Sequence, residues 1–180
     1  ARQRAIELLT AAGLPDAPRR FGEFPFQMSG GMKQRVMVAM ALAGEPKLLI
    51  ADEPTTALDV TIQAQVLDLL AELQSSRGMA ILLITHDLGV AARMAHQIGI
   101  MYAGHLVEIA SRQSLFDTPS HPYTAMLFAA LPHSGQRDSA LATIKGNVPA
   151  LTQIFTGCRF ADRCPRAWAR CVAEAPAWHS

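Results

Sequence analysis

The sequence predicts an α/β fold in which a parallel sheet is flanked by helices, and two features support this class. Two short apolar runs, residues 48–51 and 80–84, have the length of buried strands. Between them, apolar residues recur at helical spacing from Ile62 to Leu73. A strand, a helix and a second strand form a crossover unit, which places the two strands in one parallel sheet. We expect both faces of these strands to be covered.

The residues before this unit predict two helices. In the first, one apolar stripe has i, i+3, i+4 and i+7 spacing and consists of Ala5, Leu8, Leu9 and Ala12. Gly13 and Pro15 end this helix, and residues 16–27 form a connecting segment. The second helix begins at Ser29, which can cap it, and extends to about Ala43. Its residues 36–43 are apolar on all sides, which predicts a deeply buried helix.

The residues after this unit predict further short elements. We expect a helix over 88–96, and two strands over 98–102 and 106–109 joined by a tight turn at 103–104. A short capped helix over 111–116 follows, and then a helix that opens at His121 and ends at Pro132. Residues 133–147 are polar and form a linker or loop.

Composition excludes several classes of protein. The chain has 180 residues with 16 basic and 15 acidic side chains, so no charge excess favours nucleic acid as the main partner. No apolar run approaches the roughly 20 residues of a membrane helix, and no signal peptide is visible. The three cysteines, Cys158, Cys164 and Cys171, all lie near the C-terminus, which suggests a reducing compartment and a metal site.

Polar residues follow both strands. Asp52 and Glu53 come directly after the first run, where two carboxylates suit a magnesium ion and an activated water. The alternative is that they only cap the next helix. His86 follows the second run and is expected at the same edge of the sheet, although a histidine there can be purely structural.

A second group of candidate residues opens the helix at Ser29. Gly30 and Gly31 follow this residue, and a helix N-terminus with glycines suits a phosphate group. A plain capped helix start is the alternative.

Three segments in this order resemble the ATPase subunit of ABC transporters. They are the signature motif from Met28 to Arg35, the Walker B strand and D-loop from Leu48 to Asp59, and the switch histidine His86. The signature departs from the commoner pattern with Met28 in place of Leu and Met32 in place of Gln. The resemblance implies the C-terminal portion of a nucleotide-binding domain in residues 1–110, followed by a small cysteine-containing extension in residues 111–180.

The C-terminal residues, 111–180, resemble more specifically the oligopeptide/dipeptide branch of ABC importers. The supporting residues are His121-Pro122-Tyr123-Thr124 and the three cysteines. In some members of this branch, four cysteines hold a 4Fe–4S cluster, so Cys158, Cys164 and Cys171 are candidate ligands of iron–sulfur or zinc. Only three are present here, and His179 or a residue beyond Ser180 would complete the set. Three reduced thiols without a metal remain the alternative.

The sequence contains no G-x-x-x-x-G-K-[ST] phosphate loop. In the family this loop precedes the signature helix, so we interpret the chain as the C-terminal part of a larger protein. We expect the chain alone to bind ATP poorly and to hydrolyse none.

The resemblance also implies a role for each motif in the intact protein. ATP would lie between the phosphate loop of one motor and the signature residues of the other. Asp52 would hold Mg²⁺, Glu53 would activate the attacking water, and His86 would contact the γ-phosphate. Asp59 would couple the two sites across the dimer. The residues assigned to ATP phosphates and dimer coupling are Met28, Ser29, Gly30, Gly31, Gln34 and Asp59.

The partners implied are a second ATPase subunit, identical or not, two transmembrane permease subunits and, indirectly, an extracytoplasmic solute-binding protein. The location implied is peripheral, at the cytoplasmic face of the inner membrane. Peptides are the expected cargo, with nickel and other small solutes still open. Two other functions stay open: a soluble ABC ATPase of DNA repair or translation, and a half-motor that does not hydrolyse ATP.

Overall fold

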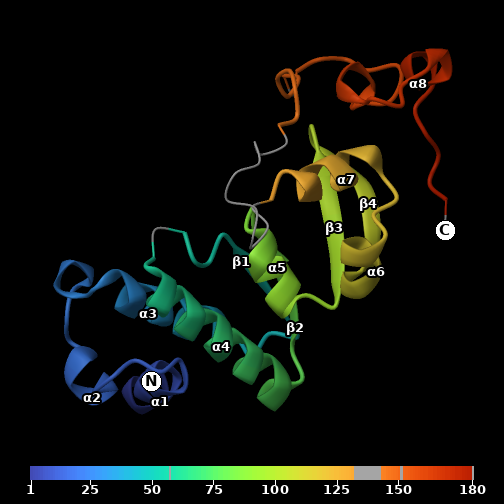
Figure 1. Ribbon diagram of the computed structural model, residues 1–180. Helices are drawn as coiled ribbons and strands as arrows, with labels where there is room; N and C mark the ends of the chain where they lie inside the picture. Colours follow the sequence, from blue (N-terminus) through green and yellow to red (C-terminus); the bar gives the residue numbers. More distant parts are fainter. Residues whose placement is uncertain (57, 132–142, 151, 180) are drawn as a thin grey trace. The chain divides into compact units, whose positions relative to one another are not determined.

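A computed structural model describes residues 1–56, 58–131, 143–150 and 152–179, and the chain forms two compact units, Ala1–Met94 and Ala95–Ser180 (Figure 1). The elements of the first unit are α1 (Arg2–Ala11), α2 (Ala17–Arg20), a 3-10 turn (Pro25–Gln27), α3 (Gly30–Leu42), β1 (Leu48–Asp52), α4 (Val60–Arg77), β2 (Ala80–Ile84) and α5 (Leu88–Met94). Those of the second are β3 (Gln97–Tyr102), β4 (His105–Ser111), α6 (Arg112–Asp117), α7 (Pro122–Ala129), a 3-10 turn (Ala161–Arg163) and α8 (Ala169–Ala173).

The strand–helix–strand unit predicted from the sequence is confirmed. β1 and β2 pair in parallel, with Leu48 opposite Ala80 and Asp52 opposite Ile84, and α4 connects them along the chain. Because both strands run in the same direction, the residues that follow them lie at one edge of the sheet. This register places Glu53 and His86 near each other.

The core of the first unit is built from one face each of α1, α3 and α4, together with β1. It contains buried Leu8, Ala12, Val38, Ala39, Leu42, Leu49, Val66, Leu69, Leu70, Leu73 and Met79. Burial of a leucine or valine side chain in such a cluster contributes about 1.5–3 kcal/mol relative to exposure. Gly78, with φ +61, ends α4 in the left-handed conformation that favours glycine.

The expectation that both faces of the strands are covered is wrong for the described residues. Successive side chains of a strand point to opposite faces. Leu49 and Ile81 pack into the helical cluster, but the alternate residues are half exposed: Leu48 52%, Ile50 61%, Leu82 50% and Ile84 46%. Within the described chain, the helices of this unit therefore bury one face and leave the other largely open.

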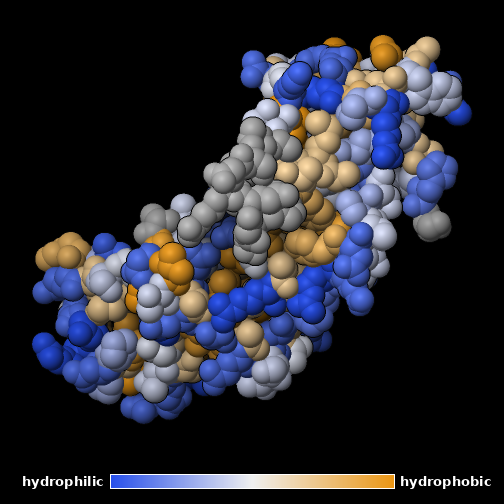
Figure 2. All heavy atoms as spheres, in the orientation of Figure 1, coloured by the Kyte–Doolittle hydropathy of each residue, from blue (hydrophilic) through white to orange (hydrophobic). Residues whose placement is uncertain are grey.

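The expectation that α3 is buried on all sides is also wrong. Val38, Ala39 and Leu42 pack into the core, whereas Met37 is 61% exposed and Met40 71% exposed. α3 contacts α1 and α4, and the three buried residues share one face of the helix, which leaves Met37 and Met40 exposed. Figure 2 shows orange apolar surface among blue polar residues on the visible face of the molecule.

The second unit begins with a hairpin. β3 and β4 are antiparallel, and the predicted tight turn is confirmed at Ala103 and Gly104, which have φ values of +45 and +79. The Ser111 hydroxyl caps α6 by accepting a hydrogen bond from Ser114 N at 3.1 Å. The buried Glu108 carboxylate accepts from Ser120 N at 2.7 Å and His121 N at 3.0 Å, which fixes the start of α7 beside β4.

An aromatic cluster attaches the C-terminal extension to this hairpin. Phe160, which is 1% exposed, lies edge-on to Tyr102 with ring centroids 5.1 Å apart, and Tyr123 lies 5.3 Å from Phe160. The 3-10 turn at 161–163 and α8 were not predicted from the sequence, because both are shorter than two helical turns. Pro132 and residues 133–142 of the predicted linker lie outside the described residues.

The predicted division after residue 110 falls at the end of β4, inside the second compact unit. That division follows sequence motifs rather than compactness, and it stays a prediction. In the part of the chain that the structure describes, no helix is both long and apolar enough to cross a membrane.

Candidate functional site

Glu53 and His86 touch at the carboxyl edge of the β1–β2 sheet. His86 Nδ1 lies 2.6 Å from Glu53 Oε1. The expected meeting of these two residues is therefore found in the structure. The His86 side chain is 82% exposed and that of Glu53 is 36% exposed, so both groups remain accessible to a ligand.

The backbone at Glu53 adopts an unusual conformation. Its φ is +48, in the left-handed region, and Pro54 follows. A residue other than glycine in this region costs about 1–3 kcal/mol and persists when its surroundings hold it in place. Here Glu53 N donates to Ile84 O at 2.9 Å, which ties the turn to the end of β2.

Thr56 is a contact that sequence reasoning missed. Its hydroxyl Oγ1 donates to Glu53 Oε2 at 2.6 Å. Both carboxylate oxygens of Glu53 therefore have a partner, His86 on one and Thr56 on the other. The sequence does carry a signal for this contact. Thr56 follows Glu53 by three residues with Pro54 between them, a spacing that is typical of a turn.

These contacts favour the charged form of each group. The Thr56 hydroxyl, and next the His86 imidazole, lower the pKa of the Glu53 carboxyl. The Glu53 carboxylate in turn raises the pKa of His86 above its ordinary value of 6.5. The contact therefore favours a carboxylate beside an imidazolium, relative to the same two groups kept apart.

We expect an NMR titration of the chain to give a pKa for His86 above its ordinary value of 6.5. Because the pKa is raised in the folded state, the stabilising contact is fully present below the unfolded pKa and is lost as pH rises through the folded pKa. Glu53→Gln removes the charge, so the pKa of His86 should return toward its ordinary value. His121 offers a control, because it lies in the other unit and burial, the main cause that lowers its pKa, is the same in both proteins. An unchanged His86 titration in Glu53→Gln would contradict the contact.

Asp52 is the last residue of β1 and is exposed. Its carboxylate forms no hydrogen bond or ion pair with a described residue. Carboxylate oxygens are the ligands that Mg²⁺ takes from proteins. The donor chemistry of Asp52 therefore fits the magnesium role that the resemblance implies.

The signature residues open α3 as predicted. The Ser29 hydroxyl accepts from Met32 N at 3.4 Å and so caps the helix. A Cβ on Gly31 would lie 2.6 Å from Ile62 Cγ2, and one on Gly30 would lie 3.5 Å from Leu58 Cδ2. Gly31 therefore has a structural reason that sequence reasoning missed: it lets α3 approach α4 closely.

The other candidate residues lie apart from the Glu53–His86 contact. Asp59 caps α4, with its carboxylate accepting from Ile62 N at 3.0 Å. Met28 and Gln34 are partly exposed, and Met28 lines a pocket described below. None of the described contacts joins Ser29, Gly30 or Gly31 to Glu53 or His86. The structure thus contains two separate groups of candidate residues in its first unit.

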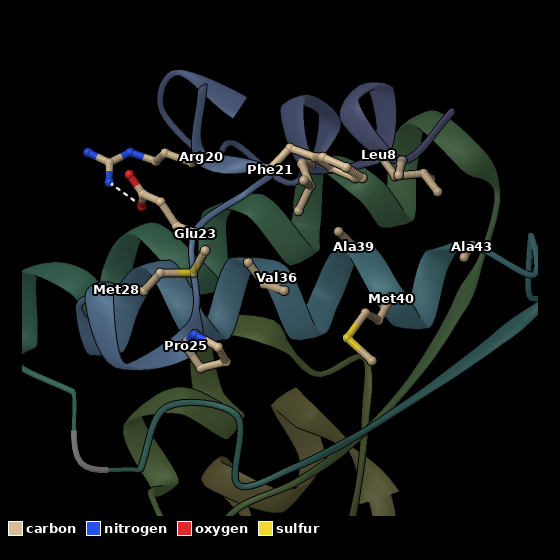
Figure 3. Close-up of a pocket in the computed structure, with 12 residues that line it drawn as sticks. Leu8, Arg20, Phe21, Glu23, Pro25, Met28, Val36, Ala39, Met40 and Ala43 are labelled. Atoms are coloured by element: carbon tan, nitrogen blue, oxygen red, sulfur yellow. Dashed lines mark hydrogen bonds and ion pairs between the residues drawn. The ribbon is translucent and has the colours of Figure 1, made fainter. Parts of the chain in front are cut away.

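An apolar pocket of about 320 Å³ lies beside α3 in the first unit (Figure 3). Val36 and Met40 of α3 point into it, and Leu8 and Phe21 approach from the preceding segment. At one end, Arg20 Nη1 and Glu23 Oε2 form an ion pair at 3.0 Å. The charges on the described lining thus compensate each other, and the remaining lining residues are apolar.

A cavity of about 580 Å³ in the second unit is lined by Cys158, Cys164 and Cys171, with His121 and His179. No three His, Cys, Asp or Glu residues among those described converge to hold a metal ion. His121 Nδ1 accepts from Tyr123 N at 3.1 Å, so its ring proton is on Nε2, the wrong tautomer for a ligand there. The geometry of the described residues does not fit a metal ion or cluster, and the iron–sulfur or zinc site stays a prediction.

Comparison with known families gives two matches. A model of the ABC transporter family matches residues 1–56, and a model of the oligopeptide/dipeptide transporter C-terminal region matches residues 107–171. The first contains the signature and Walker B residues, and the second contains His121 and the three cysteines.

Curated relatives match over nearly the whole chain. The dipeptide transport ATP-binding protein DppD of Escherichia coli is 54% identical over 176 residues, which are 98% of this chain and 54% of that protein. A putative peptide import ATP-binding protein of Brucella abortus is 51% identical, over 98% of this chain and 53% of that protein. The chain spans about half the length of the curated relatives it matches.

Two solved structures are similar to part of the chain. A dimeric post-hydrolysis structure of the ATP-binding cassette MJ0796, bound to ADP and Pi, has a TM-score of 0.54 and 34% identity and covers 61% of this chain and 46% of that chain. CbiO1 of Clostridium perfringens, part of the transporter complex CbiONQ, has a TM-score of 0.58 and 29% identity and covers 65% and 45%.

Proposed function

We propose that this chain, which belongs to the ABC transporter ATP-binding proteins of the oligopeptide/dipeptide branch, forms part of a motor that drives uptake of peptides. The observation that carries the proposal is the contact between Glu53 and His86 beyond the ends of two parallel strands. A carboxylate and an imidazole side by side, accessible from outside, suit hydrolysis of a phosphoanhydride.

Each side chain has a proposed task in hydrolysis. Glu53 accepts the proton of the attacking water, a role worth roughly 10²–10⁴ in rate. His86 contacts the γ-phosphate, and Asp52 holds Mg²⁺, which neutralises phosphate charge when it is bound. Ser29 and the backbone N–H groups after it face the phosphates of a nucleotide on a second motor. A phosphate-binding loop would come from a segment outside these 180 residues.

The proposed assembly contains a second ATPase subunit, identical or not, and two permease subunits at the cytoplasmic face of the inner membrane, with a solute-binding protein acting indirectly. The dimeric cassette MJ0796 supports the first of these. Asp59 would couple the two motors. Nickel and other small solutes are further candidate cargoes. A DNA repair or translation ATPase would account for the match at 1–56 but not for the match at 107–171.

The apolar pocket beside α3 is the proposed contact with a permease, through an apolar helix of that subunit. The opposite charges of Arg20 and Glu23 in the pocket neutralise each other. An uncharged apolar surface therefore complements the pocket best. Met40, which is 71% exposed, extends the apolar lining to the surface. α3 carries Ser29 as its cap and Met40 near its other end, so one rigid helix connects the nucleotide site to this pocket.

The test is an exchange protein, in which residues 1–180 replace the matching segment of E. coli DppD, produced in cells that lack DppD. We expect it to restore uptake of a labelled dipeptide, since 54% identity leaves most contacts in place. Cells that lack DppD and carry no exchange protein serve as the inactive control. An exchange protein that folds and binds ATP but restores neither uptake nor ATP hydrolysis would contradict the proposed function.

A further inference from the structure

We infer that Thr56 is a positioning residue for hydrolysis, whose hydroxyl holds the Glu53 carboxylate in the orientation that receives a proton from water. The inference rests on the proposed function, because it assigns Glu53 the role of base. Thr56 itself touches neither water nor nucleotide in this scheme and acts through Glu53.

The geometry gives the Glu53 carboxylate two fixed points. Thr56 Oγ1 donates to Oε2 at 2.6 Å, and His86 Nδ1 contacts Oε1 at 2.6 Å. A partly exposed glutamate otherwise samples several rotamers, and a misplaced base reduces the rate even when its chemistry is intact. One oxygen of the Glu53 carboxylate is directed to Thr56 and the other to His86, which defines the plane of the carboxylate. The remaining lone pairs on these oxygens therefore point in fixed directions.

The turn that follows β1 brings the hydroxyl to this position. Thr56 N donates to Glu53 O at 3.2 Å, which closes the turn over Pro54 and returns Thr56 to the side of the carboxylate. Thr56 is exposed, so its side chain contributes little to packing. Loss of its hydroxyl should therefore leave the fold intact, since exposed substitutions usually change stability by about 0.5 kcal/mol or less.

Thr55 provides a matched control in the same turn. It is partly exposed, and its hydroxyl forms no hydrogen bond with a described residue. A change from threonine to valine at either position removes one hydroxyl and keeps the side-chain shape. Only the change at Thr56 removes a contact to Glu53.

The experiment compares Thr56→Val, Thr56→Ser and Thr55→Val in the exchange protein assembled with its permease subunits. We expect Thr56→Val to lower kcat for ATP by about 10-fold with KM unchanged, because positioning acts on the chemical step. Thr56→Ser keeps the hydroxyl and should retain kcat within about 2-fold, as should Thr55→Val. In a Glu53→Gln background, Thr56→Val should cause no further loss.

The possible outcomes separate the inference from the function. A Thr56→Val protein with unchanged kcat, or a Thr56→Ser protein as slow as Thr56→Val, overturns the positioning role while Glu53→Gln is inactive. A Glu53→Gln protein that retains turnover overturns the role of Glu53 as base, and the inference with it. An exchange protein that folds but restores neither ATP hydrolysis nor uptake overturns the proposed function. A raised KM with unchanged kcat would place Thr56 in nucleotide binding and would also overturn the inference.

Discussion

Replacement of Glu53 by glutamine is expected to leave ATP bound and to lower turnover by at least about 100-fold, the lower range for loss of a general base. Glutamine has nearly the same shape and can still accept from the Thr56 hydroxyl, but it cannot take up the proton of the attacking water. The measurement is phosphate release by the exchange protein, together with ATP binding at equilibrium. Turnover within a few-fold of the unchanged protein would show that Glu53 is not the base.

A control separates chemistry from folding in this experiment. Glu72→Gln changes an exposed carboxylate of α4 that has no described role in the site. It should leave both ATP binding and turnover unchanged. If Glu53→Gln lost ATP binding as well as turnover, the carboxylate would have a wider role than that of a base.

Replacement of Met40 by glutamate is expected to abolish stable assembly with the permease subunits. The change places a charge where an apolar surface should dock, and burial of an unpaired carboxylate is strongly unfavourable. Because Met40 is 71% exposed before assembly, the variant should fold normally. The measurement is co-purification of the permease subunits with the tagged exchange protein, followed by ATP hydrolysis and dipeptide uptake.

Met37→Glu is the matched control for Met40→Glu. Met37 lies on the same helix and is 61% exposed, but it does not line the pocket. Its change adds the same charge to the same helix and should leave assembly intact. Loss of assembly in both variants would mean that the helix face, rather than the pocket, contacts the permease.

Much of the first unit could be predicted from the sequence because local patterns and topology agree there. The apolar runs at 48–51 and 80–84, with a helical stripe between them, were sufficient to place β1, α4 and β2. The parallel crossover predicts that His86 lies beside Glu53, and the contact between their side chains confirms this prediction. The family resemblance is confirmed by the matches at 1–56 and 107–171.

Other features depend on tertiary contacts that periodicity does not reveal. The apolar composition of α3 predicted burial on all sides, but packing against α1 and α4 uses only one face and leaves Met37 and Met40 exposed. The spacing of Thr56 after Glu53 indicates a turn, but their side-chain contact also accompanies a left-handed backbone at Glu53, which that spacing alone does not predict. The roles of the individual site residues stay predictions.

The open face of the β1–β2 sheet has a consequence for how the chain behaves outside its assembly. The described sheet has two strands, so each strand has one edge whose backbone groups pair with no described strand. The open face between these edges carries half-exposed apolar side chains, those of Leu48, Ile50, Leu82 and Ile84. Unpaired edges beside apolar side chains recruit further strands, including those of neighbouring molecules. The 180 residues on their own would therefore tend to associate with one another, and their solubility would depend on what the rest of an assembly adds to this sheet.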